Sequence, residues 1–239
     1  MNTKQLKELW KLVFGDPDSA IDTFFRTAYS PDRCRYLEEN GQPVSALYWL
    51  DCEYTGGKLA YIYAVATHPD HRGKGLASKL INETHQLLKM QGYAGAVLKP
   101  AKGLFPFYER LGYATCGYIN TFHAKAGDPL PLQELDTAAY ARRRREFLPA
   151  NSVIQEGATL DFLMTYAKVY DAGNALVCLY PDEQIIFEFL GDPAAASGIL
   201  GMLQIPEAHF ITAGTDIPYV MHYPLNCPEK PGYLGITLE

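Results

Sequence analysis

The sequence has no long hydrophobic run. Although 48% of its 239 residues are hydrophobic, no stretch approaches the roughly eighteen consecutive apolar residues that a membrane-spanning helix needs. The first residues, Met1 to Gln5, are largely polar and have no apolar run behind them, which argues against a secretory signal peptide. We therefore expect a cytoplasmic protein that does not enter the membrane.

Cysteine is scarce and scattered. The five cysteines form no close pair and leave one over, which indicates free thiols in a reducing compartment and neither a disulfide framework nor a zinc site. The six histidines form no His-x-x-x-His pair, and Asp161, Asp171 and Asp182 lack the spacing of a metal-binding loop. We therefore expect no metal dependence.

Positive charge is in deficit. Lys and Arg number 21 against 27 Asp and Glu, a net charge of −6, which argues against nucleic acid or an anionic membrane surface as the main partner and fits a cationic or amine substrate better. One basic run, Arg142 to Arg145, covers more than one helical turn, so its guanidinium groups fan around the axis. With Glu134, Asp136 and Glu146 near it in sequence, this run predicts a solvated or inter-domain helix face.

What the sequence does contain is a glycine-rich basic loop between a strand and a helix. A β-like run over 59–66 leads into His68-Pro-Asp-His-Arg-Gly-Lys-Gly75. Glycine lets the backbone pass close to a ligand, consecutive N–H groups can point inward, and a helix N-terminus adds partial positive charge. The loop therefore predicts a pyrophosphate site. The helix after it is indicated by apolar residues at helical spacing, namely Leu76, Leu80, Ile81, Leu87 and Leu88.

Two common phosphate loops do not fit this segment. A Walker loop needs Ser or Thr after its Gly-Lys, but Gly73-Lys74 is followed by Gly75. A dinucleotide fingerprint that starts at Gly73 and Gly75 has Gly or Ala as its third small residue at position 78, where this chain has Ser. No convincing acidic partner follows downstream. What remains is the pattern Arg72-x-x-Gly75-x-Ala77. The alternative interpretation is a glycine-rich strand-to-helix turn that binds no ligand.

This pattern resembles the coenzyme loop of the GCN5-related N-acetyltransferases (GNAT), whose members bind the pyrophosphate of acetyl-CoA on Arg/Gln-x-x-Gly-x-Gly/Ala. In the resembled fold the motif strand and the next strand, here 95–99, splay apart and the pantetheine arm inserts between them. A backbone N–H can then polarise the thioester carbonyl. The resemblance implies acetyl-CoA as co-substrate, no metal, and coenzyme contacts from Val65, Ala66, Thr67, Arg72, Gly73, Lys74, Gly75, Leu76, Ala77 and Ser78.

A second segment supports the resemblance. Phe105-Pro-Phe-Tyr108-Glu-Arg-Leu-Gly-Tyr113 is similar to the family's Phe-Tyr-x-x-x-Gly-Phe segment, in which the tyrosine hydroxyl lies near the coenzyme sulfur. This implies that Tyr108 contacts the coenzyme and assists the departing thiolate, a role that a phenol of pKa about 10 suits. The alternative is that Tyr108 is simply one of seventeen tyrosines and packs a helix.

The group that removes the amine proton is less defined. Glu53, on the strand before the motif strand, and Tyr63, on the motif strand, are candidate catalytic residues, and His68 lies just beyond. Their alternative roles are a solvent-facing strand end, a core residue and an exposed loop residue. The opening Leu6-x-x-Leu9-Trp10 also resembles bacterial multidomain members related to the enhanced-intracellular-survival aminoglycoside acetyltransferases. There the terminal carboxylate reaches the active site, which adds Glu239 as a candidate.

The composition divides the chain near residue 130. Residues 1–130 are expected to form the GNAT catalytic domain, and 131–239 a smaller α/β domain. The overall prediction is an α/β (α+β) fold with a central mixed, mostly antiparallel sheet flanked by helices. Patterns in the second part predict helices over 138–147, 159–170 and 193–203, and strands over 175–180, 184–190, 209–212, 219–223 and 233–238.

The second domain is expected to be a degenerate, non-catalytic GNAT-like domain. Its equivalent loop, 191–198, lacks the coenzyme pattern and places Asp192 where a phosphate would sit; an interaction module is the alternative. The first domain also departs from the family in two places. It begins with a helix where the family has a strand, and 100–103 lacks an Asn that many relatives have.

These features together predict an N-acetyltransferase. It transfers the acetyl group of acetyl-CoA by direct attack of a primary amine, on a small molecule or a peptide, and uses neither nucleic acid nor a membrane as partner. A homodimer is left open. The alternative is an acyl-CoA-binding regulatory or scaffold protein without turnover, because the fold alone does not determine activity.

Overall fold

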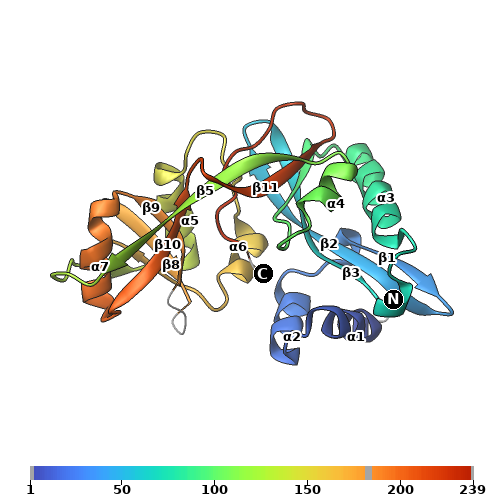
Figure 1. The fold of residues 1–239 in the computed structure, drawn as a ribbon, viewed down its shortest axis with the longest axis horizontal. Helices are drawn as coiled ribbons and strands as arrows, with labels where there is room; N and C mark the ends of the chain where they lie inside the picture. Colours follow the sequence, from blue (N-terminus) through green and yellow to red (C-terminus); the bar gives the residue numbers. More distant parts are fainter. Residues whose placement is uncertain (1–2, 181–184, 238–239) are drawn as a thin grey trace. The chain divides into compact units, whose positions relative to one another are not determined.

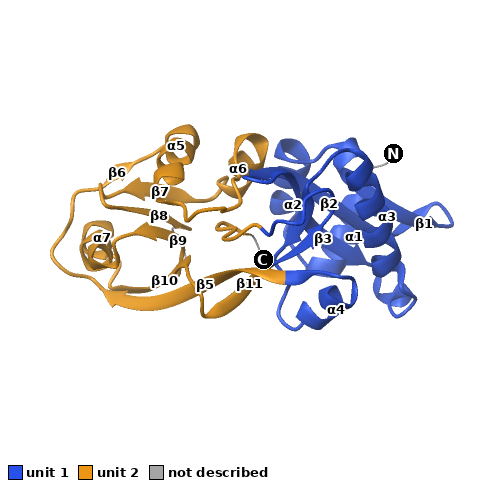
Figure 2. Cartoon of the chain, turned by 90° about the horizontal axis from the view of Figure 1, so that it is seen from above, with its two compact units in different colours: residues 1–114, 221–230 blue, residues 115–220, 231–239 orange. Residues whose placement is uncertain are grey.

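A computed structural model describes residues 3–180 and 185–237. It divides into two compact units, residues 1–114 with 221–230 and residues 115–220 with 231–239 (Figure 2). This division differs from the boundary expected at residue 130. Strand β5 (Ala114–Lys125) falls almost entirely in the second unit, because residues 119–125 pair with strand β10 (Glu207–Ala213) of that unit. Residues 221–230 return to the first unit.

The first unit is built on a mixed, mostly antiparallel sheet. Its strand order is β1-β2-β3-β4-β11. Strands β1, β2, β3 and β11 are labelled in Figure 1. Only the β3–β4 pair is parallel, and β1–β2, β2–β3 and β4–β11 are antiparallel. The expected sheet type is therefore confirmed. The strands are β1 (Cys34–Glu39), β2 (Gln42–Tyr54), β3 (Gly57–Thr67), β4 (Gly95–Leu98) and β11 (Ile217–Pro224).

Helices cover both faces of this sheet. Neighbouring residues of β2 point to opposite faces: Trp49 lies in a core cluster with Leu80 of α3, whereas the Tyr48 ring lies 5.4 Å from that of Trp10 on α1. The unit opens with a helix, as the sequence predicts. Within the described part of the chain, none of the helices is long and apolar enough to cross a membrane. The helices of this unit are α1 (Thr3–Phe14), α2 (Asp18–Thr27), α3 (Leu76–Met90) and α4 (Phe105–Arg110), with short 3-10 turns at Pro31–Arg33 (η1) and Pro69–His71 (η2).

The strands of the second unit follow one another in the order β5-β10-β9-β8-β7-β6. As in the first unit, one strand–helix–strand connection is parallel: β9 (Ile185–Gly191) leads through helix α7 (Ala196–Leu203) to β10. The remaining described pairs are antiparallel. The other elements are β6 (Gln133–Glu134), α5 (Thr137–Phe147), α6 (Gly157–Leu163), β7 (Lys168–Asp171), β8 (Ala175–Leu179) and a 3-10 turn at Pro193–Ala195 (η3).

Two predicted elements of the second unit are wrong. The helix expected over 159–170 ends at Leu163, and residues 168–171 form β7, because they pair with β8 on one side and β6 on the other. The strand expected over 233–238 is also absent: residues 231–237 are irregular, and residue 238 lies outside the described residues. This segment is held by other contacts, such as the bond from the Gln155 side-chain N–H to the Ile236 carbonyl (2.6 Å).

One member of the arginine run is buried within the second unit, whereas a solvated or inter-domain helix face was expected for it. Arg144 is 2% exposed and makes a bidentate ion pair with Glu188, with N–O distances of 2.7 and 2.8 Å. Tyr140 donates a further hydrogen bond to the same carboxylate. Gly235 has a φ of +79° and lies against this pair so closely that a Cβ would collide with both side chains. The ion pair therefore forms the base on which the C-terminal segment lies.

Replacing Arg144 with Met is expected to lower the free energy of unfolding by about 3–5 kcal/mol, because it leaves the Glu188 carboxylate buried without its counter-charge. Urea unfolding followed by circular dichroism measures the change. The matched control is Arg142→Met, at an exposed position of the same helix, which should change stability by less than about 0.5 kcal/mol. Similar losses in the two variants would contradict this account.

Protonation of His85 is expected to destabilise the fold in acid. His85, on α3, is 4% exposed, and burial lowers its pKa from 6.5 to about 4. The unfolded chain therefore binds this proton at a higher pH than the folded chain does, and the free energy of unfolding decreases as the pH falls from about 6.5 to about 4. In urea titrations, the wild type should lose about 2–3 kcal/mol more than His85→Phe over this range. Parallel curves for the two proteins would be evidence against the lowered pKa.

Candidate functional site

The ladder between β2 and β3 is interrupted just before the glycine-rich loop. Ala46 faces Ala66 and Tyr48 faces Tyr63, so two residues of β3 lie opposite the single residue Leu47 of β2. One of them, Ala64, has a φ of +48°, a left-handed conformation that is uncommon for a residue with a Cβ. This is a β-bulge, which leaves local backbone groups outside the ladder.

Strand β3 also leaves its other neighbour at this point. The parallel β3–β4 pairing runs from Leu59 opposite Gly95 to Tyr61 opposite Val97 and then stops. Strand β3 continues to Thr67, whereas β4 ends at Leu98. Beyond Tyr61, β3 is therefore without β4 as its partner, and an extended chain can bind to its main-chain groups. This agrees with the splayed strands that the resemblance implies.

Side chains hold the end of β3 in place. The Ser45 hydroxyl donates to the Ala66 carbonyl (2.9 Å) and lies 3.0 Å from the Thr67 hydroxyl. The Arg72 Nε donates to the Thr67 carbonyl (3.3 Å). The His68 N–H donates to the Val44 carbonyl (2.9 Å). The loop therefore folds back on the strand that it leaves.

The glycines of the loop adopt conformations that favour glycine. Gly73 and Gly75 have φ values of +77° and +73°, and no atom lies within 4 Å of the place where a Cβ would stand. The space beside them is open. The side chains of Arg72 and Lys74 are exposed, and the Lys74 amino group lies 3.4 Å from the His71 Nδ1. Open backbone next to exposed cations fits an anionic ligand.

The loop ends at the N-terminus of α3. The first backbone bond of this helix runs from the Lys79 N–H to the Gly75 carbonyl (3.0 Å). The N–H groups of Leu76, Ala77 and Ser78 precede that bond and have no acceptor within the helix. Together with the positive end of the helix dipole, they form a donor set that suits a diphosphate. The residues present thus fit the pyrophosphate of acetyl-CoA.

Tyr108 lies on the short helix α4 and is largely buried. It is 7% exposed and belongs to the same core cluster as Leu80 and Trp49. Burial raises its pKa to about 12, so the phenol is protonated at neutral pH. Its ring centroid lies 5.0 Å from that of Phe107 and 5.6 Å from that of Tyr113. A protonated phenol can donate a proton or a hydrogen bond.

The candidate bases are placed very differently. Glu53 is exposed and faces Lys58, where the β2–β3 hairpin closes, about 23 Å along β3 from Val65 at 3.3 Å per residue. Tyr63 precedes the bulge on β3, and its ring packs with those of Trp10 and Phe24. Of these two residues, Tyr63 lies nearer to the end of β3 that leads into the glycine-rich loop, and Glu53 lies at the opposite end of the strand pair.

The other two candidate bases are His68 and Glu239. The His68 Nδ1 accepts a hydrogen bond from the Asp70 N–H (3.2 Å) at the start of η2. Glu239 lies outside the described residues. Within the described ranges, 3–180 and 185–237, no group of three or more His, Cys, Asp or Glu side chains could hold a metal ion.

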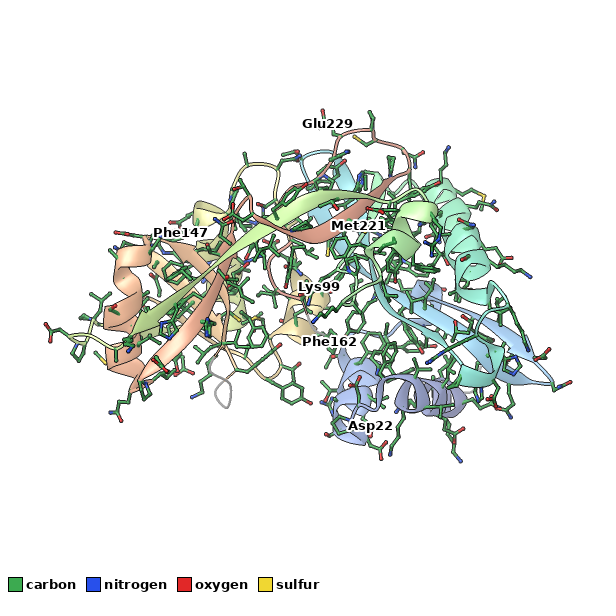
Figure 3. All side chains as sticks on the ribbon, viewed as in Figure 1. Asp22, Lys99, Phe147, Phe162, Met221 and Glu229 are labelled. Carbon is green, nitrogen blue, oxygen red and sulfur yellow. The ribbon has the colours of Figure 1, made fainter. Side chains whose placement is uncertain are left out.

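Two features of this region were not found from the sequence. Lys99, which is labelled in Figure 3, follows β4 directly. It is partly buried, and burial lowers its pKa to about 8. A cation directly after the wholly apolar strand 95–98 was the available signal. The second feature is the 2.8 Å hydrogen bond between the His85 Nε2 and the Tyr113 hydroxyl. Tyr at 113, where the family has Phe, was its only signal.

Comparison with known proteins bears on this geometry. Residues 2–116 match the family model described as an acetyltransferase (GNAT) domain. No curated protein matches the sequence. Similar solved structures include a probable N-acyltransferase of Enterococcus faecalis V583, with 18% identity, a TM-score of 0.69 and coverage of 93% of this chain and 70% of that chain.

Two further solved structures are similar to this chain at equally low identity. A GCN5-related N-acetyltransferase from Anabaena variabilis has 17% identity and a TM-score of 0.68, with 94% of this chain and 71% of that chain covered. Eis1 from Mycobacterium abscessus has 10% identity and a TM-score of 0.67, with the same coverage. At these identities the likeness shows a shared fold. Residues 2–116, just under half of the chain, therefore match the acetyltransferase (GNAT) domain family, and the solved structures share the fold of the whole chain.

Proposed function

We propose that this protein is an N-acetyltransferase that transfers the acetyl group of acetyl-CoA directly to a primary amine of a small molecule or peptide. The observation that carries the proposal is the arrangement at the end of β3. A bulge at Ala64, a missing β4 neighbour beyond Tyr61 and a left-handed glycine loop before α3 follow one another along the chain. Each suits a different part of one extended, diphosphate-containing molecule.

The coenzyme is bound mainly by backbone groups. Main-chain groups of Val65, Ala66 and Thr67, on the part of β3 without β4 as its partner, hold the pantetheine arm. The N–H groups at the start of α3 bind the pyrophosphate, and two exposed cations of the loop neutralise its charge. The full set proposed for the loop and the first helical turn is Arg72, Gly73, Lys74, Gly75, Leu76, Ala77 and Ser78.

The acetyl group moves in one step, without an acyl-enzyme. The neutral amine attacks the thioester carbonyl, a backbone N–H released by the bulge stabilises the negative charge that develops on oxygen, and the carbon–sulfur bond breaks. Tyr108 gives its proton to the departing sulfur, and the proton that the amine loses returns through water to the Tyr108 oxygen, so the products are the N-acetylated amide and the free thiol of coenzyme A. Holding amine and thioester together supplies much of the acceleration, because it makes the encounter intramolecular.

The amine must lose a proton, and Tyr63 is the best supported of the candidate bases for this step. It lies on the motif strand two residues before Val65, so its hydroxyl can order a water that accepts the proton. Glu53, at the hairpin end, is too distant to act without a rearrangement of the sheet.

We further propose that the second unit does not bind coenzyme. It repeats the parallel strand–helix–strand connection of the first unit in β9, α7 and β10. However, the Asp192 carboxylate accepts a hydrogen bond from the Ala194 N–H (2.9 Å), so an acidic side chain stands where a phosphate would bind. The second unit is thus a degenerate relative of the first.

Turnover with Tyr108→Phe tests the proposal. Free thiol released from acetyl-CoA is measured with a polyamine, a lysine peptide, an aminoglycoside and an N-terminal peptide amine as acceptors. With the acceptor that the wild type uses, Tyr108→Phe should lower kcat by about 10²-fold and leave the KM for acetyl-CoA within about threefold.

The matched control is Tyr118→Phe, at a 37% exposed tyrosine of β5, which should retain the wild-type kcat. Unchanged turnover in Tyr108→Phe would remove the phenol from the mechanism. Coenzyme binding without release of thiol for any of the amines would favour the alternative, an acyl-CoA-binding regulatory or scaffold protein.

A further inference from the structure

Tyr108 and Tyr113 are tied together by the backbone at the end of α4. The helix is only six residues long, and the Tyr113 N–H donates back to the Tyr108 carbonyl (3.1 Å). The tight return depends on Gly112, whose φ is +89°. As a result the two rings meet edge to face, with an interplanar angle of 73°. The orientation of the Tyr113 ring thus limits that of the Tyr108 ring.

The Tyr113 ring is in turn fixed from the opposite side by a histidine. Tyr113 is 3% exposed, and its hydroxyl shares the 2.8 Å hydrogen bond with the His85 Nε2 on α3. The His85 ring is stacked on Tyr223 of β11, with ring centroids 3.9 Å apart and planes inclined by 17°. Three elements of the first unit therefore hold this pair of side chains in one orientation.

The hydrogen bond between His85 and Tyr113 buries polar atoms, which costs free energy and which packing alone would not require. It lies in an apolar cluster that includes Leu88 and Met221, and the second ring nitrogen of His85, Nδ1, is buried without a partner. Two apolar side chains of similar size would fill the same space without burying an unpaired polar atom. What the polar pair adds is a fixed direction, since a hydrogen bond orients both rings and apolar contacts do not.

We propose that His85 and Tyr113 are positioning residues that hold the Tyr108 hydroxyl at the coenzyme sulfur. Neither residue touches the substrates. His85 fixes the Tyr113 ring through its hydroxyl, and the Tyr113 ring edge fixes Tyr108. The inference rests on the proposed role of Tyr108 and deepens it.

The test compares the binding of coenzyme A with that of desulfo-coenzyme A, the analogue that lacks the sulfur, by calorimetry on the full chain. The quantity of interest is the dissociation constant of desulfo-coenzyme A divided by that of coenzyme A. A hydrogen bond from Tyr108 to the sulfur should make this ratio about fivefold higher in the wild type than in Tyr108→Phe. This readout needs no acceptor amine, and it is insensitive to a general loss of stability.

Two variants remove the same hydrogen bond from either end. Tyr113→Phe keeps the ring that meets Tyr108, and His85→Phe keeps a ring that can stack on Tyr223. Both are expected to lower the ratio to the value of Tyr108→Phe, and neither should lower it further in a Tyr108→Phe background. The matched control is Tyr223→Phe, which removes a hydroxyl from the same cluster but leaves the His85–Tyr113 bond, and should keep the wild-type ratio.

The outcomes separate the two proposals. If the ratio is high in the wild type, low in Tyr108→Phe and still high in folded Tyr113→Phe and His85→Phe, the positioning role is overturned and the role of Tyr108 stands. If the ratio is the same in the wild type and in Tyr108→Phe, the Tyr108 hydroxyl does not bond to the sulfur. The role of Tyr108 and the positioning role of His85 and Tyr113 would then both be overturned. Should one variant fail to fold, the other tests the same hydrogen bond.

Discussion

The break in the β3 ladder is the constraint on which the rest of the site depends. An extra residue in β3, with Ala64 held at a φ of +48°, interrupts the pairing to β2, while β4 stops pairing after Tyr61. The main-chain groups of Ala64 and Val65 are thereby left outside the β2 ladder, and residues 62–67 have no β4 partner. Within nine residues of Thr67 the chain turns through two left-handed glycines and enters α3, so the end of β3 and the helix N-terminus both lie along one short stretch of sequence.

Buried polar pairs fix the orientation of side chains in the first unit and the position of the C-terminal segment in the second. In the first unit the bond between His85 and Tyr113 orients rings beside Tyr108. In the second, the pair of Arg144 and Glu188 supports the C-terminal segment at Gly235. Such pairs stabilise little in net terms, because desolvation offsets most of their attraction, but they define one arrangement among several that apolar packing would permit.

The glycine-rich loop and the helix that follows it could be predicted from the sequence because their signal is local. Gly73 and Gly75 stand where only a left-handed backbone makes the turn, and the apolar spacing after them defines the helix whose N-terminus they meet. Strands β3 and β4 could be predicted for the same reason, as β-like runs before and after this loop and helix, whereas residues 221–223 were expected in the second domain and belong to the first unit.

What the sequence did not reveal depends on partners far along the chain. Arg144 was read from its neighbours in the helix, but its counter-charge, Glu188, is 44 residues away. Residues 168–171 continue a helical pattern and become a strand only because β8 pairs with them. Glu53 has the right chemistry for a base, and only the register of the β2–β3 hairpin shows that it lies at the opposite end of β3 from the glycine-rich loop.

Calorimetric titration with acetyl-CoA is the most direct test of the central claim, that the glycine loop and the end of β3 form a coenzyme site. The wild type should bind with micromolar affinity. Arg72→Glu, which reverses a charge at the loop, should abolish this binding. Arg142→Glu, the same change at an exposed site of the second unit, should preserve it. Equal affinity in all three proteins, or no binding by the folded wild type, would contradict the account.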